Sequence, residues 1–135
     1  MTNAKKLGIW MDHSRAHLME FTSTPIQTKV IESAFSHEDK ERTLGSGEHQ
    51  MHNREQHQQA EYYRKLGEVI RHYEEVVIFG PTDAKVELLN LLTRNHHFAN
   101  IKIKLEQADK MTENQQHAFV RKYFLTFYEK NNNYF

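Results

Sequence analysis

Cysteine is absent from the sequence, so disulfide bonds and thiolate metal ligands are excluded. An excess of charge is absent too, because 18 Lys and Arg residues balance 18 Asp and Glu residues. No overall electric field therefore draws the chain toward nucleic acid or a membrane, although ten histidines would make it cationic in mild acid. Residues 1–14 contain no apolar run long enough for a signal peptide or a membrane span, so we expect a cytoplasmic protein of bacterial type.

The chain of 135 residues has the length of one compact domain. We predict that residues 1–130 form this domain and that residues 131–135 are a frayed tail. Residues 6–13 and 16–23 are rich in apolar and β-compatible side chains, and the polar residues between them favour a tight turn, which predicts a β-hairpin. Residues 26–33 alternate like a third strand with one buried face.

A segment poor in large apolar residues, Ser36–Gln59, follows these strands and is excluded from the core. Apolar side chains then return at helical spacing and predict a long helix whose second half packs on the sheet while its first half projects into solvent: Tyr63, Leu66, Ile70 and Tyr73. Residues 76–79 are a continuous apolar run, as in a central strand covered on both faces, and Gly80–Pro81 ends that strand.

Two more helices and one more strand complete the pattern. Thr82 is a good N-cap for a helix with a broad apolar stripe that we expect to be buried: Val86, Leu88, Leu89, Leu91 and Leu92. Residues 101–107 alternate as in an edge strand, and Thr112 with Gln115 forms a capping box that opens a helix with an aromatic core stripe: Phe119, Tyr123, Phe124 and Phe127. The order β-β-β-α-β-α-β-α predicts a mixed sheet with helices on its faces, as in a ribonuclease-H-like α/β domain.

Two stretches resemble one known protein family. Residues 7–21, LGIWMDHSRAHLMEF, resemble the opening hairpin of the middle domain of archaeo-eukaryotic class-1 translation termination factors and of the ribosome-rescue protein Pelota. Residues 76–92, VVIFGPTDAKVELLNLL, resemble a later strand of that domain, its Gly-Pro turn and the helix after it. The chain is most similar to stand-alone bacterial relatives of the domain, a group that overlaps host-attachment and translational-machinery proteins. The resemblance implies a ribosome or a tRNA-bearing complex as partner, no membrane and no cofactor.

In that family a Gly-Gly-Gln loop, which positions water against peptidyl-tRNA, lies between the two stretches. Gly45, Gly47 and Gln50 occupy this slot here, and they are the catalytic candidates if the chain hydrolyses peptidyl-tRNA. Ser46 separates the two glycines, and two further residues separate them from the glutamine, so we predict a binding protein rather than a peptide-release enzyme. The resemblance implies these binding residues: Lys40, Arg42, Gly45, Gly47, His49 and Gln50.

Three carboxylates leave a second function open. Asp12, Asp83 and Asp109 lie near predicted strand ends, where ribonuclease-H-like nucleases gather carboxylates around two Mg²⁺ ions. Each residue also has a sufficient local role, because Asp12 fits a turn, Asp83 fits a helix cap and Asp109 precedes a helix. A protein-interaction module without any link to translation is the third alternative.

The Gly80–Pro81 turn raises the possibility of an anion site, because amides at a helix N-terminus and Lys85 could hold a phosphate. Helix capping alone explains the same residues, so we predict a simple strand-to-helix connection. We predict no metal site, because no ligand spacing of a known kind links the histidines of the hairpin and of the apolar-poor segment: His13, His17, His49, His52 and His57. His96 and His97 are expected to interact with the last carbonyl groups of the helix before them.

Overall fold

The computed structural model describes residues 5–21, 27–33 and 48–132, with side chains from 55 to 125 in the last range. Within these residues the chain forms five strands, three α-helices and one short 3₁₀ helix. In chain order they are β1 (Lys6–Met11), β2 (Arg15–Phe21), β3 (Thr28–Glu32), α2 (Glu48–Ile70), β4 (Glu75–Gly80), α3 (Ala84–Thr93), η2 (His96–Phe98), β5 (Lys102–Gln107) and α4 (Glu113–Asn132). The predicted mixed α/β fold and its order of strands and α-helices are confirmed.

The strands form one mixed sheet in the order β3-β2-β1-β4-β5. β1 pairs antiparallel with β2, and β2 pairs antiparallel with β3, whereas β4 runs parallel to both β1 and β5. β4 therefore lies inside the sheet and β5 forms one of its edges, as their apolar and alternating sequences predicted. The carboxyl ends of β1, β4 and β5 consequently meet along one border of the sheet.

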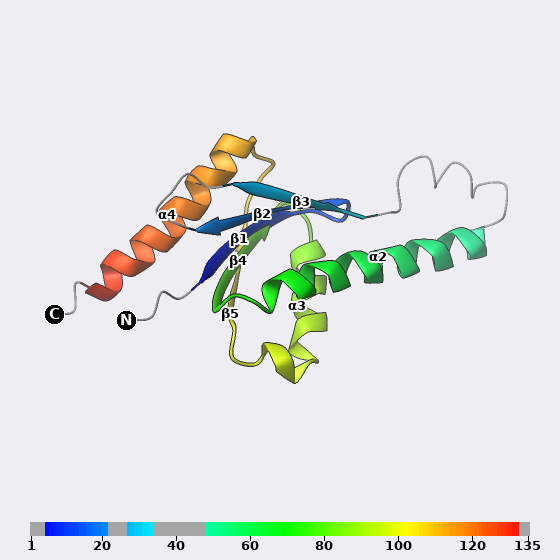
Figure 1. Ribbon diagram of the computed structural model, residues 1–135. Helices are drawn as coiled ribbons and strands as arrows, with labels where there is room; N and C mark the ends of the chain where they lie inside the picture. Colours follow the sequence, from blue (N-terminus) through cyan, green and yellow to red (C-terminus); the bar gives the residue numbers. More distant parts are fainter. Residues whose placement is uncertain (1–4, 22–26, 34–47, 133–135) are drawn as a thin grey trace.

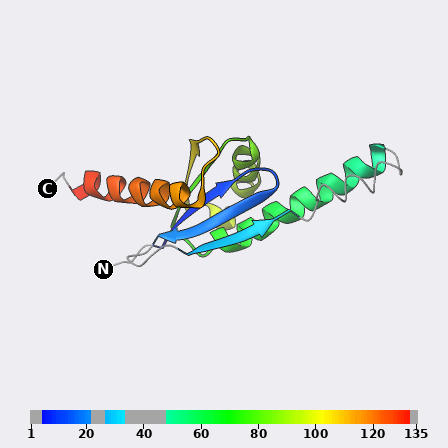
Figure 2. The same ribbon diagram turned by 90° about the horizontal axis from the view of Figure 1, so that it is seen from above.

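Helices cover both faces of the sheet: α2 and α3 lie on one face and α4 on the other (Figures 1 and 2). Alternation along β1 sends Ile9 and Met11 into the cluster beneath α2 and α3, while Trp10 enters the smaller cluster beneath α4. α4 approaches β1 so closely that a Cβ added to Gly8 would lie 2.3 Å from Val120 Cγ2. This glycine is thus the position where the helix and the strand come into contact.

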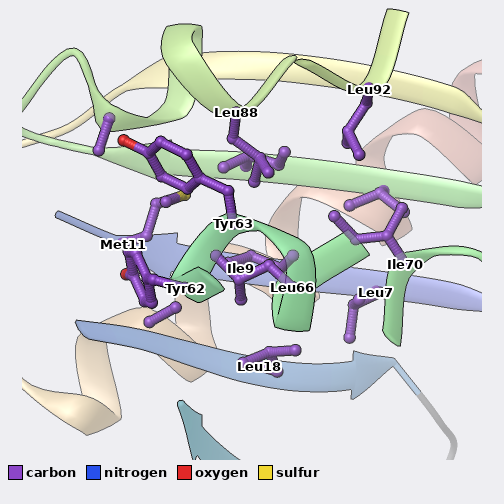
Figure 3. Packing of buried hydrophobic residues seen from close by; sticks show 14 residues of the cluster. Leu7, Ile9, Met11, Leu18, Tyr62, Tyr63, Leu66, Ile70, Leu88 and Leu92 are labelled. Atoms are coloured by element: carbon purple, nitrogen blue, oxygen red, sulfur yellow. The ribbon is translucent and has the colours of Figure 1, made fainter. Parts of the chain in front are cut away.

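The second half of α2 packs on the sheet, and its first half extends beyond the sheet (Figures 1 and 2). Tyr62, Tyr63, Leu66 and Ile70 are all buried and lie between the strands and α3 (Figure 3). The helix ends at Ile70, so Tyr73, which we expected on the helix, instead lies in the turn before β4. Among the described side chains of α2, the buried ones lie in its second half, as the sequence predicted.

α3 buries a narrower stripe than its sequence predicted. Leu88 and Leu92 are buried, but Val86 is 41% exposed and Leu91 is 42% exposed. The expectation that the whole apolar stripe is buried was wrong, because the helix contacts the sheet along one side and α2 along another and leaves its outer surface uncovered. The surplus apolar residues therefore contribute exposed surface rather than core.

The predicted capping box at the start of α4 is confirmed. Gln115 N donates to Thr112 Oγ1 at 3.2 Å, and Thr112 N donates to Gln115 Oε1 at 2.9 Å. Of the predicted aromatic stripe, Phe124 is buried, and the partly buried Phe119 stacks on Phe79 of β4, while the side chain of Phe127 lies outside the described residues. None of the helices in the described part of the chain combines the length and the apolarity that a bilayer crossing requires.

Candidate functional site

The border formed by the carboxyl ends of β1, β4 and β5 carries several of the polar side chains that the sequence singled out, among them Asp12, Asp83 and Lys85. At the end of β1, Asp12 Oδ1 accepts hydrogen bonds from Ser14 N at 2.7 Å and from Arg15 N at 2.9 Å. Asp12 N also donates to Arg15 O at 3.0 Å, so this residue closes the β1–β2 turn. Tyr62 on α2 donates from its hydroxyl to Asp12 O at 2.9 Å, which fixes the turn against the helix.

Beside this turn, β4 ends in Gly80, whose φ of +154° is accessible to few residues other than glycine. A Cβ at this position would lie 2.1 Å from the carbonyl oxygen of Met11, so the backbone of β4 passes directly against the end of β1. Asp83, rather than the expected Thr82, is the N-cap residue of α3, and its side chain makes no capping hydrogen bond. Thr82 Oγ1 instead accepts from Ala84 N at 3.2 Å.

The side chain of Lys85 stabilises the turn after β4 through hydrogen bonds. Its side chain is buried, and its ammonium group donates to Gly80 O at 3.0 Å, Thr82 O at 2.6 Å and Gln107 Oε1 at 2.9 Å. An ammonium group has three N–H donors, so Lys85 has no donor left for an anion. The Gly-Pro turn therefore connects β4 to α3, as predicted, and the hydrogen bonds of Lys85 join it to the end of β5.

A chain of three side chains crosses the same border and joins the β1–β2 turn to both helices. Tyr63 on α2 donates from its hydroxyl to Glu87 Oε1 at 2.6 Å, and the second oxygen of Glu87 lies 3.1 Å from Nε2 of His13. Burial and the hydrogen bond to Glu87 raise the pKa of Tyr63, whereas the hydrogen bond from Tyr63 lowers the pKa of Glu87. The carboxylate is thus held in its charged form next to an exposed imidazole.

The three carboxylates predicted as nuclease candidates do not meet in one cluster. Asp83 and Asp109 are exposed at separate turns, and Asp12 is engaged by turn amides. Among the described residues, no group of three or more His, Asp or Glu side chains is arranged to hold a metal ion. Two further candidates, His49 and Gln50, lie in the first turn of α2. The other four lie outside the described residues: Lys40, Arg42, Gly45 and Gly47.

Three further histidines contact neighbouring side chains. His17 Nδ1 lies 2.8 Å from Oε1 of the buried Gln116, and its ring lies 5.5 Å from the Trp10 ring. His96 and His97 form η2 and pack ring against ring at 4.5 Å. They extend the chain past α3 as a 3₁₀ turn, and no hydrogen bond between their rings and the α3 carbonyls occurs in the described part of the chain.

Sequence reasoning missed the buried Lys85 and the Tyr63–Glu87–His13 connection. Lys85 had a detectable signal, because it precedes Leu88 by three residues and Leu92 by seven and so lies on the buried face of α3. Glu87 and His13 are 74 residues apart and had no local signal. Their contact exists only because α3 and the β1–β2 turn meet at the border of the sheet.

The fold described above is similar to part of three solved protein structures. The chain is similar to Pelota from Thermoplasma acidophilum (TM-score 0.54, 14% identity) and to Pelota from Archaeoglobus fulgidus (TM-score 0.55, 7% identity). It is equally similar to the archaeal translation termination factor aRF1 (TM-score 0.56, 13% identity). At these identities the likeness establishes the fold alone.

The similarity covers most of this chain but a minor part of the larger proteins. It includes 82%, 96% and 95% of the chain in the three comparisons, in the order given above, and only 30%, 38% and 40% of the other proteins. No protein-family model and no curated protein matches the sequence. The relationship to these three proteins therefore rests on the structure.

Proposed function

We propose that this protein is a translation-related binding protein that associates with the ribosome or with a tRNA-bearing complex. The observation that carries the proposal is the similarity of nearly the whole chain to part of Pelota and of a translation termination factor. The sequence resemblance of residues 7–21 and 76–92 to the middle domain of such factors supports the same function. We infer that residues 1–130 act as one domain, equivalent to that middle domain, and that the chain is a bacterial relative of it.

The proposed contact region is the segment Lys40–Gln50. Its last residues lie in the first turn of α2, at the end of the helix farthest from the sheet (Figure 1). A helix that projects from its domain can insert the segment before it into a crevice of a large particle while the sheet remains outside. Lys40 and Arg42 would contact phosphate groups, and the glycines would permit a close approach to the backbone of the RNA.

The proposed role is binding and not peptide release. The segment GSGEHQ, Gly45–Gln50, is longer than the Gly-Gly-Gln tripeptide of the family and includes Glu48. Hydrolysis of peptidyl-tRNA develops negative charge on an oxygen, and a nearby carboxylate would oppose that charge. We therefore expect no appreciable release of peptide from stalled ribosomes.

The test is sedimentation of the full chain with ribosomes over a series of salt concentrations. The double variant Lys40→Ala/Arg42→Ala should bind more weakly and with a flatter salt dependence, because about one counterion is released for each phosphate contact. The matched control is Lys110→Ala/Arg121→Ala, which removes one lysine and one arginine from exposed positions near α4. Equal binding by all three proteins at every salt concentration would contradict the proposed contact region.

Two further measurements separate this function from its alternatives. Peptide release that is lost in Gln50→Ala would show that the divided glycine motif is catalytic. Mg²⁺-dependent cleavage of RNA that is lost in Asp12→Asn would favour the nuclease. Absence of any ribosome association in the wild-type chain would contradict the proposed association with the ribosome.

A further inference from the structure

The edge strand β5 presents a row of main-chain groups that point away from the sheet. Lys102 N donates to Glu74 O at 3.0 Å, and Ala108 N donates to Gly80 O at 3.2 Å, so the even-numbered residues of β5 face β4. Main-chain groups alternate in direction along a strand, and the N–H and C=O groups of Ile103, Leu105 and Gln107 therefore point outward. In the described parts of the chain, no hydrogen bond reaches these groups.

The charges of the side chains along β5 are complementary to those of a second, antiparallel copy of β5. Lys104 and Glu106 lie on the α4 face of the sheet, on either side of Leu105. If a second β5 runs antiparallel with Leu105 opposite Leu105, then Lys104 of each copy lies opposite Glu106 of the other copy. In the same register Ile103 lies opposite Gln107, so every outward-pointing main-chain group of these residues has a partner.

The other face of the same edge carries apolar surface that nothing in the described chain covers. A hollow of about 390 Å³ lies between α3, η2 and the start of β5, and its walls include Leu89, Thr93 and Ile103. Val86, three residues before Leu89, continues this side of α3 and is 41% exposed. A second copy related by a two-fold axis through Leu105 would place its own α3 next to this apolar surface.

We propose that the protein forms a symmetric dimer through antiparallel pairing of β5 with β5 of a second copy. The two sheets become one continuous sheet, and the two α3 helices meet above the junction and cover each other's exposed apolar side chains. A two-fold axis closes the assembly at two copies, because each β5 has one free edge. Lysine on an edge strand ordinarily discourages pairing, but here Glu106 of the opposite copy neutralises Lys104.

The experiment is sedimentation velocity of the full chain from about 1 to 100 μM. The wild-type chain should reach the mass of a dimer. Lys104→Glu and Glu106→Lys should each raise the dissociation constant about tenfold or more, because each variant replaces two opposite-charge pairs by two like-charge pairs. The double variant Lys104→Glu/Glu106→Lys should restore dimerisation, because it reverses both members of each pair.

The matched control is Lys102→Glu, which reverses an equal charge on the same strand but has no charged residue opposite it in this register. It should dimerise like the wild-type chain. Amide hydrogen exchange gives an independent measurement: exchange at Ile103 and Leu105 should slow as concentration rises, whereas the amides of Lys104 and Glu106, bonded to β4, should be protected at all concentrations.

A monomeric wild-type chain at all these concentrations would overturn the proposal. A dimer that tolerates both single charge reversals, or that the double variant does not restore, would also overturn it, because another surface would then hold the copies together. Circular dichroism of each variant distinguishes loss of pairing from loss of folding. Ribosome sedimentation is a separate measurement, so failure of the dimer and failure of the proposed function can be told apart.

Discussion

Lys85 illustrates how a single residue can organise a turn without a counter-ion. Its ammonium group is buried, and its three partners are two main-chain carbonyls and one amide oxygen rather than a carboxylate. A buried cation is tolerated only when its donors are satisfied, and these three acceptors satisfy all of them. The lysine thereby joins the end of β4, the start of α3 and the end of β5, which are the elements that frame the border of the sheet.

Gly80, in the same turn, gives a prediction at the residue scale. We expect Gly80→Ala to lower the free energy of unfolding by about 2 kcal/mol or more, because the backbone has a φ of +154° and the new Cβ would meet Met11 O. Chemical denaturation monitored by circular dichroism measures the change. Gly67→Ala on α2 is the control, since its Cβ would lie 3.4 Å from Leu92 Cδ2 in ordinary contact, and it should change stability by no more than about 1 kcal/mol. Equal stability of Gly80→Ala and the wild-type chain would contradict this account of the turn.

At the scale of elements, the helices differ in how much of their surface the fold uses. α2 packs with its second half only, and α3 leaves Val86 and Leu91 exposed although both are apolar. α4 contacts the sheet through Val120 and Phe124 and begins with a complete capping box. Because the capping box supplies acceptors to two main-chain amides at the start of α4, this cap should contribute measurably to stability.

We therefore expect Thr112→Ala to lower the free energy of unfolding by about 1 kcal/mol, since it leaves the amide of Gln115 without its acceptor. Asn114→Ala changes a neighbouring exposed residue in the same turn and should alter stability by less than about 0.5 kcal/mol. Urea unfolding of the two variants and the wild-type chain measures both values. If the two substitutions have the same effect, the cap does not stabilise the helix.

At the scale of the whole molecule, three tyrosine hydroxyls connect the region of α2 to the sheet and to α3. Tyr62 donates to the β1–β2 turn, Tyr63 to Glu87 of α3, and Tyr73 to Glu20 of β2 at 2.6 Å. Burial raises the pKa of all three, and the hydrogen bond to Glu20 adds to the shift at Tyr73. The neutral tyrosines thus hold the helix in place over the sheet.

This arrangement predicts how stability depends on alkaline pH. Burial, together with the hydrogen bond to Glu20, raises the pKa of Tyr73 to about 12 from its ordinary value of 10.0. A group whose pKa is higher in the folded state stabilises the fold below the unfolded pKa and loses that contribution as pH rises through the folded one. Stability should therefore fall between about pH 10 and pH 12, and Tyr73→Phe should make this fall shallower.

Thermal unfolding at a series of pH values measures both profiles. Glu87 titrates on the acid side, because the hydrogen bond from Tyr63 lowers its pKa below 4.5. Its contribution to stability is present above that value and is lost as pH falls through the folded pKa, so Glu87→Gln should make the fall on the acid side shallower. The same variant should lower the pKa of Tyr63, which loses its charged acceptor, so it also affects the alkaline side. An alkaline profile that is identical in Tyr73→Phe and the wild-type chain would contradict the role given to Tyr73.

Several features of the fold could be predicted from the sequence alone: the order of elements, the central place of β4, the edge place of β5, the capping box of α4 and the turn at Asp12. Each of these depends on residues close together in the chain, whose periodicity and turn chemistry act locally. Tertiary packing was needed to show that His13 reaches Glu87 and that Val86 and Leu91 remain exposed. These outcomes depend on which elements meet, and a side chain on an amphipathic helix carries no local record of whether its neighbour will be a strand, another helix or solvent.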